Sequence, residues 1–121
     1  MLQCINALLH WSVLPVKRPP ARTSAARDAA LDGLVEALLA VRTREDLHAL
    51  LTDLCTPAEL EAMADRWQVV PLLLEELPYR DIHQRTGVSV TTIGRVARCL
   101  SSGAGGYRQA ATALGLHRHR S

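Results

Sequence analysis

The sequence predicts an all-α fold, and three observations lead to that prediction. From Asp28 onward apolar residues recur at helical spacing, and we find no alternating run suited to a β-strand. The chain has no Phe and few other aromatic residues, so its core has to be built from Leu, Val and Ala, a composition that favours helices. With 48% hydrophobic and 21% charged residues, the chain of 121 residues is expected to form one domain, and this composition excludes low-complexity disorder.

Both ends of the chain are expected to lie outside that domain. The apolar start, MLQCINALLHWSVLPV, lacks the preceding basic segment of a signal peptide and is too short to span a membrane as a helix. The basic stretch after it contains Pro19 and Pro20, which oppose a helix. We therefore predict a flexible basic arm over 1–27, a helical domain over 28–116 and a basic tail over 117–121. An upstream start codon included in error is the alternative explanation of the arm.

The first two predicted helices occupy 28–42 and 44–54, and each carries one apolar stripe. The stripes consist of Leu31, Leu34, Val35, Leu38 and Leu39 in the first and of Leu47, Leu50, Leu51 and Leu54 in the second. Two long apolar stripes on so small a domain favour a dimer, because a monomer of about 90 residues has difficulty burying them.

A third helix is predicted from Thr56, which is a suitable N-cap for Pro57 in the first helical position. Glu59 is placed to complete a capping box with Thr56. Pro71 should kink or interrupt this helix, and Pro78 should end it. Its expected apolar face comprises Leu60, Met63, Ala64, Trp67 and Val70.

Two short helices, 79–86 and 90–101, form a predicted helix-turn-helix, and a last helix at 107–115 follows a glycine-rich connection, which makes six helices in total. Gly87 suits the turn because a left-handed backbone costs little only for glycine, and Ser89 is a natural N-cap for the second helix. The residues expected to face the partner helix and the body of the domain are Ile82, Val88, Ile93 and Val96.

The remaining face of the second short helix is small, polar and basic, as a helix that enters the major groove of DNA requires. It comprises Val90, Thr91, Gly94, Arg95 and Arg98. On the first helix, Arg80, His83 and Arg85 are suited to the flanking phosphates. Many such motifs have a small residue at the position of His83, so we expect either a looser helix crossing there or an outward-pointing ring. A plain helical hairpin with a polar surface is the alternative interpretation.

The charges support an interaction with DNA. Residues 1–27 carry four basic residues and no acid, 28–81 hold all twelve acids and a net charge of −8, and 82–121 carry six arginines and no acid. A net charge of +2 thus conceals two basic ends, for which a polyanion is a natural partner.

No catalytic or metal site is predicted. Cys4, Cys55 and Cys99 are widely spaced without a CxxC pair, which is typical of free thiols in a reducing cytoplasm. The five histidines have no metal-ligand spacing with a cysteine or carboxylate. No nucleophile–base set or phosphate-binding loop occurs either, so we predict that the protein is not an enzyme.

Thr-Pro-x-Glu at 56–59, Arg66, the stretch RDIHQRTGVSVTTIGRVARCL at 80–100 and GGYRQA at 105–110 resemble the bacterial Trp repressor family, closest to its YerC/YecD group. The resemblance covers residues 30–115. It implies a six-helix domain, an intertwined homodimer whose outer helices share one core, and a transcriptional repressor of an amino-acid pathway bound to a palindromic operator.

The resemblance also implies roles for individual residues. Operator contacts fall on Tyr79, Arg80, His83, Val90, Thr91, Thr92 and Gly94, to which our own interpretation of the motif adds Ser89, Arg95 and Arg98. Corepressor contacts fall on Thr56, Arg66, Arg95 and Cys99. Arg95 thus has two possible roles, toward ligand or toward DNA.

Departures from the family pattern leave the corepressor open. Cys99 stands where the family has a serine for the ligand's ammonium group, and Asp53 and Cys55 replace apolar residues of the pocket. An effector other than tryptophan, or none, fits equally well. A protein-interaction adaptor that keeps the fold without reading an operator, with 28–54 as its main surface, is the alternative function.

Overall fold

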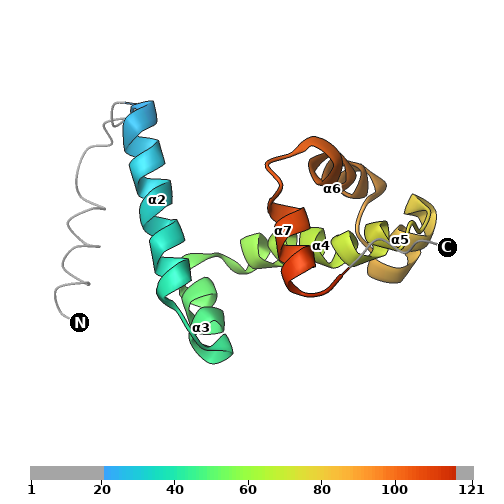
Figure 1. Cartoon of the computed structure of the whole chain (residues 1–121), viewed down its shortest axis with the longest axis horizontal. Helices are drawn as coiled ribbons and strands as arrows, with labels where there is room; N and C mark the ends of the chain where they lie inside the picture. The colour runs from blue at the N-terminus through green and yellow to red at the C-terminus, as the bar shows by residue number, and fades with distance from the viewer. Residues whose placement is uncertain (1–20, 117–121) are drawn as a thin grey trace, which may run out of the picture. The chain divides into compact units, whose positions relative to one another are not determined.

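The computed structural model describes residues 21–116, and in that range α-helices are the only regular secondary structure. Its elements are α2 (Ser24–Ala40), α3 (Arg44–Leu54), α4 (Pro57–Leu74), α5 (Tyr79–Thr86), α6 (Val90–Ser102) and α7 (Gly106–Ala113) (Figure 1). The predicted all-α class with six helices is confirmed for this range. Most of the predicted arm and the tail at 117–121 lie outside the described residues.

The chain divides into two compact units, Met1–Arg42 and Thr43–Ser121, where the sequence predicts one domain over 28–116. In the first unit, α2 begins at Ser24, four residues before the predicted start. The reason is Thr23, whose side-chain oxygen accepts a hydrogen bond from the Ala26 amide at 3.1 Å and so caps the helix. Residues 24–27 therefore belong to a helix and not to a flexible arm.

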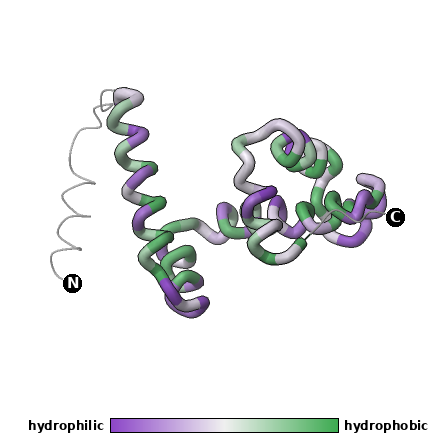
Figure 2. Tube along the Cα trace, in the orientation of Figure 1, coloured by the Kyte–Doolittle hydropathy of each residue, from purple (hydrophilic) through white to green (hydrophobic). Residues whose placement is uncertain are grey.

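Helix α2 buries none of its residues, although apolar and hydrophilic residues alternate along it (Figure 2). Leu31 is 58% exposed, Val35 45% and Leu39 78%. Leu34 and Leu38 are half-buried. This helix thus presents a largely exposed apolar stripe.

In the second unit, α4 contacts α3, α5, α6 and α7 (Figure 1). The predicted capping box at its start is confirmed. The Glu59 amide donates to Thr56 Oγ1 at 3.2 Å, and the Thr56 amide donates to Glu59 Oε1 at 2.9 Å. Two of the free amides at the start of the helix are therefore paired.

The capping box makes stability depend on pH. Hydrogen bonds from the Thr56 amide and then from its side chain lower the pKa of the Glu59 carboxyl from its ordinary value of 4.5. A carboxyl whose pKa is lower in the folded than in the unfolded state stabilises the fold at pH values above its unfolded-state pKa. This contribution is lost as the pH falls through the folded-state pKa. Below about pH 4.5 we expect the parent to lose stability more steeply than Glu59→Gln, measured by urea unfolding at several pH values. Parallel curves would contradict this account.

The end of α4 differs from the prediction. The helix continues through Pro71 and ends at Leu74, whereas the sequence predicts a kink or an interruption at Pro71 and an end at Pro78. Glu76 then adopts a left-handed backbone with φ 62°. The Leu77 amide turns back to the Leu72 carbonyl at 3.3 Å, which ends the helix before Pro78 is reached.

The core lies where α4, α5, α6 and α7 meet. Its buried apolar residues are Val69, Val70, Leu74, Ile82, Val88, Ile93, Val96, Leu100 and Ala111. On α4 the predicted face is only partly correct, because Val70 is fully buried but Met63 is 45% exposed. Val69, which the predicted face omits, is fully buried as well. Trp67 packs against this core, with its ring centroid 6.4 Å from that of Tyr107.

Candidate nucleic-acid interface

Helices α5 and α6 form the predicted helix-turn-helix. Gly87 ends α5 in the left-handed conformation, φ 75° and ψ −1°, and its amide donates to the His83 carbonyl at 2.8 Å. The four residues predicted to face inward are all buried, with exposed fractions of 0% for Ile82, 5% for Val88, 0% for Ile93 and 1% for Val96. The two helices are thus packed against each other and against the core.

The turn predicts a clear cost for a side chain at Gly87. Gly87→Ala should lower the free energy of unfolding by about 1–2 kcal/mol, because an L-residue pays that much in a left-handed backbone. Gly106→Ala is the control, because nothing lies within 4 Å of a Cβ there and its φ is not positive. Urea unfolding of both variants checks the difference, and equal stabilities would contradict it.

The second helix begins with the cap that the sequence predicts. Ser89 Oγ accepts a hydrogen bond from the Thr92 amide at 3.1 Å and donates to Thr92 Oγ1 at 2.9 Å. Both hydroxyls therefore serve first to fix the start of α6. The first turn of α6 contains no acidic residue, so the partial positive charge at its N-terminus is available to an anion.

Four residues of α6 form one exposed surface, which we call the reading face: Val90, Thr91, Arg95 and Arg98. Thr92 and Gly94 are half-buried beside it. A Cβ on Gly94 would lie 3.8 Å from Cε2 of Tyr79, so the Tyr79 ring lies close against α6 at this position. Tyr79 is still 42% exposed. The start of α5 and the middle of α6 therefore present one continuous surface.

On α5, Arg80 and Arg85 are exposed as the sequence predicts. His83 is also exposed, yet its Nδ1 lies 2.7 Å from the Val88 carbonyl oxygen, so the ring is tied to the turn. Of the two expectations for His83, the exposed ring agrees with the outward-pointing one, and its Nδ1 is nevertheless held by the turn.

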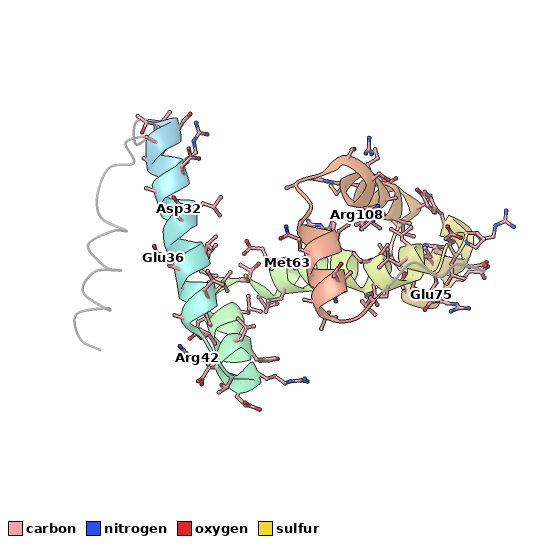
Figure 3. All side chains as sticks on the ribbon, viewed as in Figure 1. Asp32, Glu36, Arg42, Met63, Glu75 and Arg108 are labelled. Atoms are coloured by element: carbon pink, nitrogen blue, oxygen red, sulfur yellow. The ribbon has the colours of Figure 1, made fainter. Side chains whose placement is uncertain are left out.

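Basic residues dominate the C-terminal part of the second unit. Between residues 82 and 116 the sequence has four arginines and no acid, and all four arginines are exposed. Arg108 reaches from α7 to the C-terminal half of α6, where its Nε donates to the Leu100 carbonyl at 2.8 Å (Figure 3). Arg108 thus has a structural partner, whereas Arg95 and Arg98 lie on the reading face.

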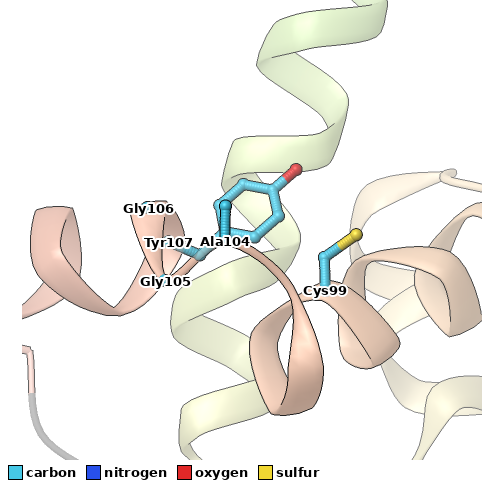
Figure 4. Close-up of a pocket in the computed structure, with 5 residues that line it drawn as sticks. All are labelled: Cys99, Ala104, Gly105, Gly106 and Tyr107. Carbon is cyan, nitrogen blue, oxygen red and sulfur yellow. The ribbon is translucent and has the colours of Figure 1, made fainter.

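The predicted corepressor residues lie on different elements, with Arg66 on α4 and Arg95 and Cys99 on α6. A pocket of about 320 Å³ lies between α6 and α7, lined by Cys99, Ala104, Gly105, Gly106 and Tyr107 (Figure 4). Cys99 is the one predicted ligand residue in that lining. Thr56 and Arg66 are exposed on α4 or at its start, and the Thr56 hydroxyl is occupied by the capping box.

Sequence reasoning missed this pocket, although the signal for it was present. The backbone at Gly103 packs tightly against the end of α6, because a Cβ there would lie 2.4 Å from the Cys99 carbonyl oxygen. Gly105 adopts φ 89° just before α7. These glycines let the chain turn sharply after α6, and the pocket lies inside that turn.

The model of the Trp repressor protein family matches residues 29–114, which is more than half of the chain. The chain belongs to the Trp repressor protein family. The uncharacterized protein YerC of Bacillus subtilis is 37% identical over 84 residues, covering 69% of this chain and 81% of YerC. This confirms the predicted resemblance of the chain to the YerC group of the family.

Solved structures of the Trp repressor family agree with this fold. A candidate Trp repressor from Staphylococcus aureus superimposes with a TM-score of 0.72 at 30% identity, covering 81% of this chain and 100% of that chain. A TrpR-like protein from Eubacterium eligens gives 0.70 at 32% identity, covering 75% and 94%. The family is one of regulatory DNA-binding proteins and not of enzymes.

Residues 21–116 contain neither a candidate metal cluster nor a candidate membrane span. No group of three or more His, Cys, Asp or Glu residues in this range is placed to hold a metal ion. Within the same range, no helix is long and apolar enough to cross a membrane.

Proposed function

We propose that this protein is a homodimeric, sequence-specific DNA-binding repressor that reads a palindromic operator with α6. The observation that carries the proposal is the reading face, which is exposed, basic and free of acidic residues. It lies on a helix whose opposite side is fixed in the core by Ile93, Val96 and Leu100. A rigid helix with small and basic exposed residues is what major-groove recognition requires.

Each part of this surface has an expected role. The small residues Val90 and Thr91 contact base edges, and Thr92 and Gly94 let the helix approach them closely. Arg95 and Arg98 bind guanine or phosphate, since a guanidinium can donate two parallel hydrogen bonds to either. The remaining contacts, to the DNA backbone, fall on Tyr79, Arg80 and Ser89.

Dimerisation is supported by the apolar residues that a single chain leaves exposed. On α2 these are Leu31, Val35 and Leu39, and in the second unit they include Leu47, Leu54 and Met63. A second copy of the chain supplies a matching apolar surface, as a two-fold symmetric interface requires. Two reading faces related by two-fold symmetry recognise inverted half-sites.

A salt titration tests DNA binding. The protein should bind duplex DNA at low salt, and log K should fall linearly with log salt concentration as counterions are released from the phosphates. Failure to bind any duplex at low salt would contradict the proposal. It would favour the alternative function, a protein-interaction adaptor that keeps the helical fold and binds a protein through 28–54.

A small-molecule effector is the second part of the proposal, and the pocket between α6 and α7 supports it. The pocket adjoins Cys99 on the helix that bears the reading face, so a bound ligand can change how α6 is presented to DNA. An amino-acid-like molecule, not necessarily tryptophan, is the expected ligand class. The test is to repeat the titration with a panel of free amino acids. If no amino acid changed the affinity for duplex DNA, the effector part of the proposal would be contradicted.

A further inference from the structure

The turn between α5 and α6 is held by side chains of α5. The Val88 amide donates to Thr86 Oγ1 at 3.1 Å, and the Val88 carbonyl accepts from His83 Nδ1 at 2.7 Å. The Thr86 hydroxyl in turn donates to the Ile82 carbonyl at 2.7 Å. Val88 is only 5% exposed, so its backbone groups need such partners. We call His83, Thr86 and Val88 the turn cluster.

The hydrogen bond determines which nitrogen of His83 carries a proton. A carbonyl oxygen only accepts hydrogen bonds, so Nδ1 must be the donor. Nδ1 carries a proton both in the matching neutral tautomer and in the imidazolium, and the bond to Val88 is therefore compatible with either charge state. Nε2 takes no part in it.

The turn cluster is directly connected to the start of α6. Val88 precedes Ser89, whose hydroxyl caps the helix through the Thr92 amide at 3.1 Å. The Ser89 carbonyl accepts the first bond of the helix, from the Ile93 amide at 3.0 Å. A shift of the Val88 peptide would therefore tilt α6 and displace the reading face, whose contacts to bases need accurate placement.

We infer that His83 is a positioning residue for DNA recognition, which acts through the Val88 carbonyl and not through a contact to DNA. This inference rests on the proposed function. It assigns to His83 a role different from the phosphate contact that the sequence predicts. Loss of the Nδ1 donor should then weaken binding to the specific site and leave binding to random duplex DNA unchanged.

Two amide substitutions separate these roles. His83→Asn places a donor close to the position of Nδ1 and has no group at the position of Nε2, whereas His83→Gln does the reverse. We expect His83→Asn to retain operator affinity within about threefold and His83→Gln to lose about tenfold, the equivalent of one net hydrogen bond. The reverse order would show that Nε2 contacts DNA and would overturn the inference. So would equal affinities of the two variants.

Thr86 provides a second pair of variants. Thr86→Ser keeps the hydroxyl, and Thr86→Val replaces it with a methyl group of similar shape. The valine variant should lose operator affinity, the serine variant should keep it, and both should bind random duplex DNA like the parent. Equal operator affinity of Thr86→Val and the parent would contradict a positioning role of the turn cluster.

The hydrogen bond itself can be tested without DNA. Nitrogen chemical shifts of the His83 ring in the parent protein should show a protonated Nδ1 in the neutral ring as well as in the charged one. A neutral ring protonated on Nε2 would overturn the inference even if the protein binds DNA. A parent that binds no duplex, with Nδ1 protonated as expected, would instead refute the proposed function.

Discussion

Replacing Arg95 by alanine should reduce operator affinity by about a hundredfold or more and bring it close to the affinity for random duplex DNA. One bidentate contact between arginine and guanine contributes about 1–3 kcal/mol to discrimination, and a dimer loses two of them. Arg95 is exposed on the reading face, and its helix is capped and anchored in the core. Filter binding or fluorescence anisotropy on a fixed operator measures the loss.

Arg44→Ala is the matched control, because it removes the same charge from the exposed start of α3. It should change operator affinity by less than about threefold, since a distant surface charge acts only through a screened field. Undiminished affinity of Arg95→Ala would show that the reading face is misplaced. Equal losses in both variants would show that Arg95 contributes only general charge.

The second large effect should follow from a charge on the apolar stripe of α2. Leu39 is 78% exposed in a single chain, and the proposed dimer covers it. Leu39→Glu buries an unpaired carboxylate in that interface, which costs several kcal/mol. We expect sedimentation to show twice the 13.2 kDa chain mass for the parent and the single mass for the variant. Operator affinity should fall with it, because one reading face then acts alone.

Glu36→Gln serves as the control on the same helix, where Glu36 is exposed and lies off the apolar stripe (Figure 3). This variant should remain a dimer. A dimeric Leu39→Glu, or a parent that sediments as a monomer, would contradict the proposed interface.

The helix-turn-helix could be predicted accurately because its signals are local. Gly87 and Ser89 mark the end of one helix and the start of the next, and each acts through its own backbone conformation or side chain. The capping box at Thr56 and Glu59 is local in the same way. Burial of Ile82 and Ile93 followed from helical spacing alone.

The errors lie where tertiary structure decides. The end of α4 depends on Glu76, whose left-handed backbone is uncommon for a residue other than glycine. The start of α2 was predicted too late in the sequence, because its cap, Thr23, lies in a basic stretch rich in proline. The hydrogen bond of His83 to Val88 joins residues five apart across the turn, and no sequence pattern predicts it.

The residues predicted for a ligand illustrate a further limit. A family resemblance assigns positions, but it does not determine which side chains are free to bind. The Thr56 hydroxyl oxygen accepts a hydrogen bond from the Glu59 amide, and Cys99 lines a pocket with Tyr107. Only the structure distinguishes a side chain with an internal partner from one that lines a cavity.

Selection of bound sites from random duplex DNA tests the central claim most directly. We expect enrichment of one inverted repeat, with half-site centres about 10 base pairs apart or a multiple of that spacing, and loss of that enrichment in Arg95→Ala. Enrichment of no sequence by the parent protein, or of the same repeat by Arg95→Ala, would contradict it.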